Sequence, residues 1–569
     1  MPHRAHLFSL RIAHALREAC FAEPYGASRF MRDLLAGVTV GVIAIPLAMA
    51  LAIASGVPPQ YGLYTAIIAG FLIPLLGGSR LSISGPTAAF VVILYPIAQQ
   101  YGLGGLLVAS LMAGMLMVIM ALLRLGRLIE YIPEAVVLGF TAGIAVVIAT
   151  LQVKDFLGLQ LPAMPEHYLE KLRLLMQHLP DLNWPSFMVA TATLLVMLLW
   201  PLLKLPVPPH LPALLVGTLI ALLLNQTGFA VDTIGSRFSY TLADGSSGFG
   251  IPAQLPQFEW PWLQAGVNGE VIQWNLRVLQ DLLVAACAIA LLGAIESLLC
   301  AVVLDGMTGK RHSANSELLG QGIANMVTPF FGGITATAAL ARSAANVRAG
   351  AESPVAGMIH ALVVLLGLVA LAPVLAYLPM PAMAALLVMV AWGMSEAPKA
   401  LHLIKTAPRG DIWVFITCFA LTVLFDMVIA ITAGILLAAL LFMKEIAAMT
   451  RLEELDSNSE QPLPENWRAF RICGPLFFAA ADRIFGELST LCLERQHIIL
   501  SFKEVSLLDA GGLSALNKLI LKCQKNNTEL ILTDIPKQPL GALAHAHIQP
   551  IQGVLRFYGS VDEARKVIC

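Results

Sequence analysis

Residues 74–90 read PLLGGSRLSISGPTAAF, and residues 329–345 read PFFGGITATAALARSAA. Both stretches begin with a Pro-x-x-Gly-Gly element and continue into an unusually short apolar segment, and they lie about 255 residues apart. One such element alone carries little information, because Gly and Pro are frequent in membrane helices. The shared sequel and the short length of both segments indicate an internal repeat.

The sequence around these two copies is that of a membrane protein. The 569 residues are 58% hydrophobic and 12% charged, and their mean hydropathy is +0.78, whereas an average soluble domain carries about 25% charged residues. Apolar stretches near the length that crosses a hydrocarbon core of about 30 Å recur along most of the chain. The predicted spans are 34–55, 61–76, 87–100, 105–123, 134–151, 186–203, 211–225, 282–304, 316–331, 335–347, 354–375, 381–396, 411–424 and 427–444.

The number of spans between the two copies determines their relative orientation. Seven predicted spans separate them, and because this number is odd the second copy is inverted across the membrane. Inverted repeats with discontinuous helices are typical of secondary transporters, in which half-helix N-termini face a bound anion near the midplane. The sequence therefore predicts a polytopic α-helical membrane protein of about fourteen transmembrane segments.

The basic residues indicate which loops face the cytosol. The segment 1–33 carries several arginines and no small-residue cleavage site follows the first apolar run, so we expect it to be cytosolic and uncleaved. Counted from that side, the cytosolic loops include Arg80 and Lys310. Two polar inserts, 152–183 and 226–280, have little apolar period and are expected to be periplasmic loops.

The composition changes after the transmembrane region, which is predicted over 34–444. Charged residues return in RLEELDSNSEQPLPENW, which predicts a linker over 445–466, and the pattern from 467 to 569 is that of a soluble α/β domain. We expect strands in RAFRICG, HIILSFKEVS and ELILTDI. Helices are expected in ADRIFGELSTLCLERQ, in AGGLSALNKLILKCQKN and from Val561 to Cys569.

The chain resembles the SulP anion transporters, which carry a C-terminal STAS domain. The motifs that carry the resemblance are AGVTVGVIAIPLAMALAIASGVPPQYGLYTAIIAG (36–70), GGSRLSISGPTAAF (77–90), LDGMTGKRHSANSELLGQGIANMVTPFFGGITATAALARSAANVRAGAESPVAGMIHAL (304–362) and VSLLDAGGLSAL (505–516). The resemblance covers about 30–569 and implies a 7+7 inverted repeat with core and gate domains, a homodimer and elevator-like alternating access. It also implies a bacterial inner-membrane location with the STAS domain in the cytosol.

Within that family the chain looks similar to enterobacterial proton-coupled transporters of C4-dicarboxylates, which implies uptake of succinate, fumarate or aspartate. One departure bears on the substrate: many sulfate-type members have Gln after an Ile-Pro pair, and this chain has Leu47 after Pro46. The change favours the bicarbonate and carboxylate branches over a sulfate carrier. Three alternatives remain: a sodium-coupled transporter of bicarbonate or another small anion, an anion channel, and a membrane sensor whose STAS domain recruits a cytosolic protein.

Two ionisable residues inside predicted spans are candidates for the transport chemistry. Glu296 is the only carboxylate in the interior of the span 282–304, where an unpaired charge is costly. The resemblance places this position beside the substrate, so we expect Glu296 to carry the coupling proton; a structural hydrogen bond to a neighbouring helix is the alternative. Arg342 needs an anion or a carboxylate, and its fork suits a carboxylate substrate, the alternative being a fixed salt bridge, for example with Glu296.

The starts of the two short segments are the expected binding positions for the substrate. First-turn N–H groups of a helix have no internal partners, and small residues let a ligand approach them. We expected the second segment to start at Thr335, and for Thr87 helix capping is the equal alternative to substrate contact. The predicted substrate-binding residues are Ser84, Pro86, Thr87, Ala88, Thr337, Ala338, Ala339, Arg342 and, by resemblance, Pro46.

Signatures of enzymes are missing from the sequence. It contains no GxxxxGK[ST] phosphate loop, no HExxH and no GxSxG, and its eight cysteines include no CxxC pair. We therefore expect no catalytic activity, no cofactor and no metal centre, and a gradient-driven rather than an ATP-driven mechanism. In the STAS-like motif Asp509 is followed by Ala510, where anti-sigma-antagonist relatives have a phosphorylatable Ser, so no phosphorylation is expected at that position.

Overall fold

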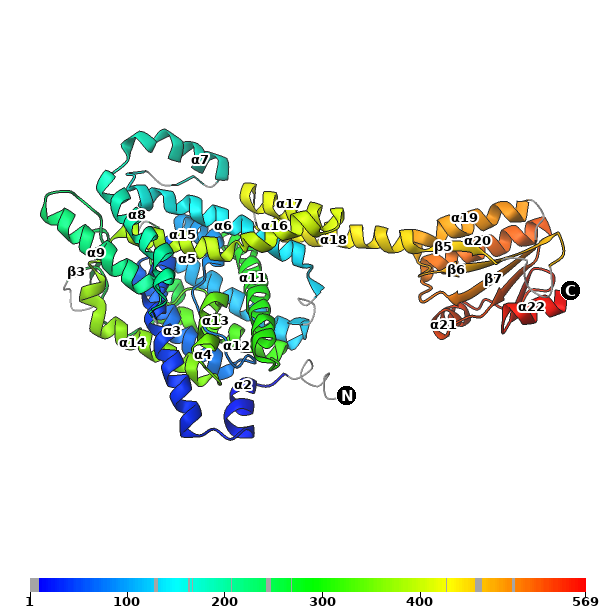
Figure 1. Ribbon diagram of the computed structural model, residues 1–569, viewed down its shortest axis with the longest axis horizontal. Helices are drawn as coiled ribbons and strands as arrows, with labels where there is room; N and C mark the ends of the chain where they lie inside the picture. The colour runs from blue at the N-terminus through cyan, green and yellow to red at the C-terminus, as the bar shows by residue number, and fades with distance from the viewer. Residues whose placement is uncertain are drawn as a thin grey trace. The chain divides into compact units, whose positions relative to one another are not determined.

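The computed structural model contains two compact units, Met1–Ile435 and Leu436–Cys569, whose elements are labelled in Figure 1. The structure describes residues 10–126, 131–161, 164–165, 167–205, 207–241, 247–267, 269–425, 427–455, 463–493 and 497–568.

The first unit is helical. Its helices and helical turns are α2 (His14–Leu16), η2 (Arg17–Ala22), α3 (Ala27–Ala54), α4 (Pro59–Leu76), α5 (Ala88–Leu122), α6 (Glu134–Leu157), α7 (Tyr168–Gln177), η4 (Leu179–Asp181), α8 (Trp184–Leu199), η5 (Trp200–Leu203), α9 (His210–Gln226), α10 (Ile234–Arg237), η6 (Pro261–Leu263), α11 (Leu276–Thr308), α12 (Ala314–Val327), η7 (Thr328–Phe331), α13 (Leu340–Arg348), α14 (Val355–Leu375), α15 (Met380–Met394), α16 (Ala397–Thr406), α17 (Arg409–Leu424) and α18 (Met427–Met449), the last of which continues into the second unit. Its short strands are β1 (Ser84–Gly85), β2 (Ser239–Thr241), β3 (Ser247–Phe249) and β4 (Thr337–Ala338).

Each predicted span overlaps one of these helices. The predicted spans 87–100 and 105–123 both fall in α5, which bends at Gly102, where φ is 66° and a methyl group would lie 2.5 Å from the Gly266 carbonyl carbon. Among the described residues, nine helical stretches are long and apolar enough to cross a membrane, and α9 is a shorter apolar helix. The two polar inserts contain more structure than predicted: α6 continues to Leu157, α7 follows it, and β2 pairs with β3.

The helices of the first unit pack in two groups. In one group, α3 packs on α4 and α14, and α5 packs on α11 and α12. In the other group, α6 packs on α15 and α17, and α8 packs on α9 and α15. The helices α11, α12 and α14 therefore pack against α4 and α5, the helices that flank the first Pro-x-x-Gly-Gly copy.

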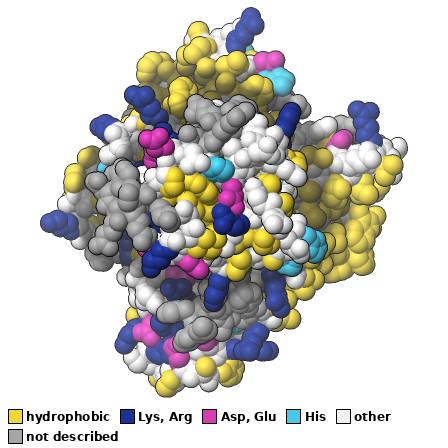
Figure 2. Space-filling model, turned by 90° about the vertical axis from the view of Figure 1, so that its right-hand side faces the viewer, with side chains coloured by type: hydrophobic (Ala, Val, Ile, Leu, Met, Phe, Trp, Pro, Cys, Tyr) yellow, Lys and Arg dark blue, Asp and Glu magenta, His cyan; other side chains and the backbone are white. Residues whose placement is uncertain are grey.

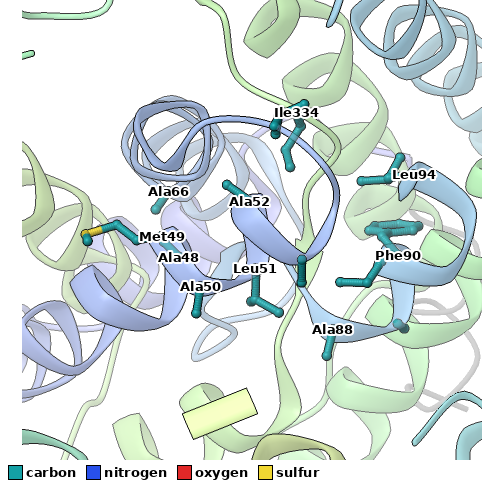
Figure 3. Close-up of a cluster of buried hydrophobic side chains, with 14 of the residues drawn as sticks. Ala48, Met49, Ala50, Leu51, Ala52, Ala66, Ala88, Phe90, Leu94 and Ile334 are labelled. Carbon is teal, nitrogen blue, oxygen red and sulfur yellow. The ribbon is translucent and has the colours of Figure 1, made fainter. Parts of the chain in front are cut away.

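Small residues allow close packing in the first group. Figure 3 shows Ala48 and Ala52 on α3 near Ala66 of α4, and Phe90 on α5 in the same cluster. A methyl group on Gly62 of α4 would lie only 2.0 Å from the Ala48 carbonyl oxygen, so glycine is required for this contact. Such close backbone approach through small residues is the usual way in which membrane helices associate.

The outer surface of the first unit keeps many large apolar side chains exposed. Examples are Leu215 on α9, Leu366 on α14 and Trp413 on α17, which are 62%, 59% and 62% exposed. Figure 2 shows a broad area of hydrophobic side chains at its right-hand edge, whereas Lys, Arg, Asp and Glu side chains are scattered over the rest of the visible face. Exposed apolar area on this scale is expected of helices that face lipid.

The second unit is a five-stranded sheet with helices. Its strands are β5 (Arg451–Glu454), β6 (Trp467–Cys473), β7 (His497–Glu504), β8 (Leu530–Thr533) and β9 (Leu555–Tyr558), in this order across the sheet. Its helices are α19 (Phe478–Leu493), α20 (Ala510–Asn526), α21 (Lys537–His545) and α22 (Val561–Ile568). β5 is antiparallel to β6, and the other neighbours are parallel.

Both faces of this sheet are covered, because successive side chains of a strand point to opposite faces. Ile498 and Leu500 pack in the cluster that includes α19 and α20, whereas Ile499 packs with Ala564 of α22. Figure 1 shows α19 and α20 on one face and α22 on the other. The predicted strands and helices of this domain are present, with Cys569 outside the described residues.

Two strands and one helix of the second unit were not predicted from the sequence. β5 forms the edge of the sheet although its residues fall in the predicted linker, and 456–462 of that linker lie outside the described residues. β9 and α21 were not predicted either. β5 reads RLEE and is largely solvated, so it lacks the apolar pattern that identifies a strand.

Candidate functional site

Two short strands lie where the Pro-x-x-Gly-Gly copies lead into their helices. β1 and β4 pair antiparallel, with Ser84 opposite Ala338 and Gly85 opposite Thr337. All four residues are buried. Because α5 follows β1 within three residues and α13 follows β4 within two, the pair brings both helix starts to one buried place.

Both helix starts have unused hydrogen-bonding capacity. Thr87 and Ala339 are the N-cap residues of α5 and α13. The Thr87 hydroxyl accepts no hydrogen bond from α5, and the Ala339 methyl group has no atom that could accept one from α13. Ala88, the first residue of α5, is also small and buried. First-turn N–H groups without internal partners and the positive end of the helix dipole together favour an anion at such a position.

The second half-helix begins later than the sequence predicted. We expected it at Thr335, but α13 begins at Leu340. The residues before it are held by side chains: Thr335 Oγ1 lies 2.6 Å from Ser110 Oγ, and Asn325 bonds the N–H and the carbonyl of Ala336 at 2.8 and 2.9 Å. The backbone stays extended because these groups are satisfied without a helix.

One face of α11 contacts both helix starts. Thr87 Oγ1 donates a hydrogen bond to Glu296 Oε2 at 3.1 Å, so this hydroxyl contacts α11 instead of capping α5. The next residue, Ser297, has its Oγ 2.6 Å from Thr337 Oγ1, and Thr337 also donates to the Gly293 carbonyl at 3.2 Å. Glu296 therefore contacts the predicted substrate position Thr87, and the adjacent Ser297 contacts the predicted position Thr337.

The Arg342 guanidinium is buried against β1. The side chain is 3% exposed, and its Nη2 donates to the Pro86 carbonyl at 2.5 Å. Its Nε and Nη1 have no hydrogen-bond partner in the part of the chain that the structure describes, and no ion pair to Glu296 forms there. The consecutive residues Pro86 and Thr87 thus contact the guanidinium and the carboxylate respectively, and no carboxylate of the described residues is bound to the guanidinium.

Pro46 lies apart from this hydrogen-bond network. It is buried in the middle of α3, where proline has no N–H to donate and interrupts the helical hydrogen bonds. α3 packs on α4, α13 and α14, the helices around β1. Leu47 is partly exposed and packs against the hydrophobic cluster of the first unit.

Several polar residues of the site were not singled out from the sequence. Ser343 Oγ accepts a hydrogen bond from the Ile83 N–H at 2.8 Å, and Ser110 and Asn325 hold the segment before β4. His360 of α14 is fully buried. These residues could have been noticed in the sequence only as polar residues inside apolar spans. That pattern does not show which residues they contact in the fold. No group of three His, Cys, Asp or Glu side chains suited to a metal is found among the described residues.

The sequence was compared with known families and proteins. The model of the sulfate permease family matches residues 30–418, and that of the STAS domain matches residues 460–564. The "Putative sulfate transporter YvdB" of Bacillus subtilis is 38% identical over 542 residues, which are 95% of this chain and 98% of that protein. The "Bicarbonate transporter BicA" of Synechocystis is 29% identical over 486 residues, 80% of this chain and 79% of that protein.

Solved structures agree with this assignment. The transmembrane domain of a cyanobacterial bicarbonate transporter BicA has a TM-score of 0.61 at 29% identity, over 71% of this chain and 98% of that one. SLC26A9 has a TM-score of 0.81 at 17% identity, over 98% of this chain and 92% of that one, which shows a shared fold. These relatives are transporters, not enzymes. The chain is therefore a multi-pass membrane protein that belongs to the sulfate permease family and carries a C-terminal STAS domain.

Proposed function

We propose that this protein is a secondary active transporter that takes up small C4-dicarboxylates together with protons. The observation that carries the proposal is the arrangement at β1 and β4: two helix starts without side-chain caps lie beside a buried guanidinium with no carboxylate partner among the described residues. A buried positive charge is costly unless an anion accompanies it. An anionic substrate supplies that partner while it is bound.

Glu296 is the proposed proton-coupling residue. Its carboxylate accepts a hydrogen bond from Thr87, the residue at the start of α5, so loading an anion there changes the surroundings of the carboxylate directly. A carboxylate locked in an ion pair with Arg342 would not exchange its proton readily, and that ion pair is not formed among the described residues. Proton uptake on Glu296 reduces the repulsion between its charge and an arriving dicarboxylate.

The substrate class follows from the family resemblance and from Leu47. A second candidate is a bicarbonate carrier with sodium coupling, and the identity to BicA favours it. The name of the Bacillus subtilis relative adds sulfate to the anions that an uptake assay must include. The three substrates differ in charge and size, so they are separable in one competition experiment.

The wider mechanism is also part of the proposal. We infer alternating access of the elevator type, in which the group of helices containing β1 and β4 moves against the group containing α6, α15 and α17. Membership of the family and the two helix groups support this inference. We further infer a homodimer in the bacterial inner membrane, with the N-terminus and the STAS domain in the cytosol and the STAS domain available to a cytosolic protein partner.

The test is uptake of radiolabelled succinate into proteoliposomes that contain the purified protein, in sodium-free buffer with or without an inward proton gradient. We expect accumulation only with the gradient. The variant Glu296→Gln should lose gradient-driven accumulation and retain exchange, because an amide can accept the Thr87 hydrogen bond but cannot carry a proton. Asp281→Asn is the matched control, since Asp281 is an exposed carboxylate on the same helix, bonded to Tyr101.

Two results would count against the proposal. Sodium-dependent uptake of bicarbonate without succinate uptake would favour the second candidate. Full accumulation by Glu296→Gln would show that another group couples the proton.

A further inference from the structure

Three buried polar side chains around β1 have atoms without a partner in the described part of the chain. They are Ser84 Oγ, Nε and Nη1 of Arg342, and both ring nitrogens of His360. Ser84 and His360 are 0% exposed, and Arg342 is 3% exposed. A buried polar group without a partner is destabilising, so three of them near β1 call for an occupant that bonds them.

The three groups border the same stretch of α4. A methyl group built on Gly70 would lie 3.3 Å from the Ser84 carbonyl oxygen and 3.4 and 3.5 Å from Cε1 and Nδ1 of His360. A methyl group built on Gly85 would lie 2.9 Å from Arg342 Nη1 and 3.6 Å from the Ala66 Cα. Ala66 and Gly70 are about one turn apart, about 6 Å along the helix. The imidazole and the guanidinium therefore both lie near β1 and the Ala66–Gly70 turn of α4.

The chemistry of this cluster identifies the kind of occupant. Arg342 offers only N–H donors, Ser84 offers a hydroxyl that can donate, and a neutral imidazole offers one N–H. Donors thus exceed acceptors, and the guanidinium adds a full positive charge. Oxygens of an anion supply both the missing acceptors and the missing negative charge, and charge-assisted bonds of this kind are the strong ones.

Glycines let α3 and α4 pack closely against α14 at His360. Gly41 of α3 and Gly70 of α4 face His360 from two sides, and a methyl group on Gly41 would lie 3.1 Å from the His360 carbonyl oxygen. The small residues keep charged and titratable side chains of α3 and α4 away from the imidazole at these contacts. Arg342 of α13 is a charged group that lies against β1, as the His360 imidazole does.

We propose that Ser84, Arg342 and His360 form a subsite for the second carboxylate of a dicarboxylate whose first carboxylate lies at the starts of α5 and α13. His360 then determines the preference for dicarboxylates over monocarboxylates. This inference rests on the proposed function, and it names the residue that selects the substrate class. His360 was not expected from the sequence, whereas Ser84 and Arg342 were predicted substrate-binding residues.

The test is equilibrium binding of radiolabelled succinate and butyrate to the full-length purified protein, because these ligands have the same chain length and differ in one carboxylate. Ser84→Ala removes only a hydroxyl, and His360→Asn removes the ring. Each should weaken succinate binding by about tenfold, the loss expected for one hydrogen bond to a charged group, and should leave butyrate binding within about twofold. His210→Asn is the matched control, because His210 of α9 also has a ring nitrogen without a partner among the described residues.

The outcomes separate the subsite from the proposed function. If wild type prefers succinate over butyrate and Ser84→Ala and His360→Asn bind succinate as wild type does, the subsite is wrong and the dicarboxylate function stands. If wild type binds neither ligand but binds bicarbonate or sulfate, the dicarboxylate function is wrong and the subsite falls with it. Should His360→Asn fail to fold, Ser84→Ala alone decides.

Discussion

Replacing Gly78 by Ala should destabilise the membrane unit more than any surface change of the same size. Gly78 follows α4 and packs against the start of α12, where its N–H donates to Glu317 Oε2 at 2.9 Å. The Ser79 N–H donates to the same oxygen, and Glu317 is fully buried. The added methyl group would lie 2.3 Å from the Ser313 carbonyl oxygen and 2.8 Å from the Glu317 nitrogen.

The magnitude follows from two terms. Ordinary contact needs more than 3.4 Å, so the backbone at Gly78 must move by about 1 Å, and forcing extra volume into a packed interior costs about 1–3 kcal/mol. A shift of this size also breaks the Gly78 hydrogen bond to the buried carboxylate, which is worth about 1.5–3 kcal/mol. The total is about 2.5–6 kcal/mol. Because Gly78 leads directly into β1, succinate uptake should fall as well.

The assay is thermal unfolding of the purified protein, followed by loss of the monodisperse chromatographic peak after heating. Gly306→Ala in α11 is the matched control: no atom lies within 4 Å of the methyl group that it adds. Gly in a helix is less favourable than Ala by about 0.5–1 kcal/mol, so the control should melt at the wild-type temperature or slightly above it. Gly78→Ala should melt several degrees lower. Equal melting temperatures for the two variants would refute the packing argument.

Three further predictions concern the N-terminal segment and the STAS domain. Asp33→Asn should lower the melting temperature by several degrees, because Asp33 Oδ2 accepts from Ser353 Oγ at 2.5 Å and an amide nitrogen in that place cannot. The hydrogen bond from Arg80 holds the pKa of the Glu23 carboxyl below its ordinary value of 4.5. The contact between these two side chains therefore stabilises the N-terminal segment above pH 4.5, and this stabilisation is lost as the pH falls through the lowered pKa. The protection factors of the segment's amides against hydrogen exchange should therefore fall on acidification in wild type, and Glu23→Gln should abolish this pH dependence. Asp509→Ala should cost about 1 kcal/mol by removing the N-cap of α20, and it also removes the acceptor of the Phe478 N–H, so faster hydrogen exchange is expected at the starts of α20 and α19.

Most of the membrane fold could be predicted from the sequence because its signals are local. A helix that crosses lipid must satisfy its own backbone and keep an apolar surface, so length and hydropathy identify it. The inverted repeat was visible because close contacts favour glycine at both Gly78 and Gly333. A methyl group added to either residue would lie 2.3 Å from a neighbouring atom. The repeated Gly-Gly pattern in the sequence thus results from close packing at two places in the fold.

The site could be predicted only in part, because its decisive contacts join distant segments. β1 and β4 have two residues each and lie more than 250 positions apart, so neither has a local strand signal. His360 lies in the apolar run VAGMIHALVV, where a single polar residue does not indicate a binding site. Its relation to Ser84 depends on how α14 packs against α4, which tertiary structure alone determines.

Arg342 is the residue for which stability offers no sufficient explanation. A buried guanidinium that served only the fold would be paired, because an uncompensated buried charge is strongly destabilising. Here one nitrogen bonds a backbone carbonyl and two have no partner among the described residues. Real proteins keep such local conflicts where function requires them. If the conflict is relieved by substrate, then succinate should raise the melting temperature of wild type and should not raise that of Arg342→Ala, although that variant removes the unpaired charge. Stabilisation of Arg342→Ala by succinate equal to that of wild type would show that the guanidinium is not part of the binding site.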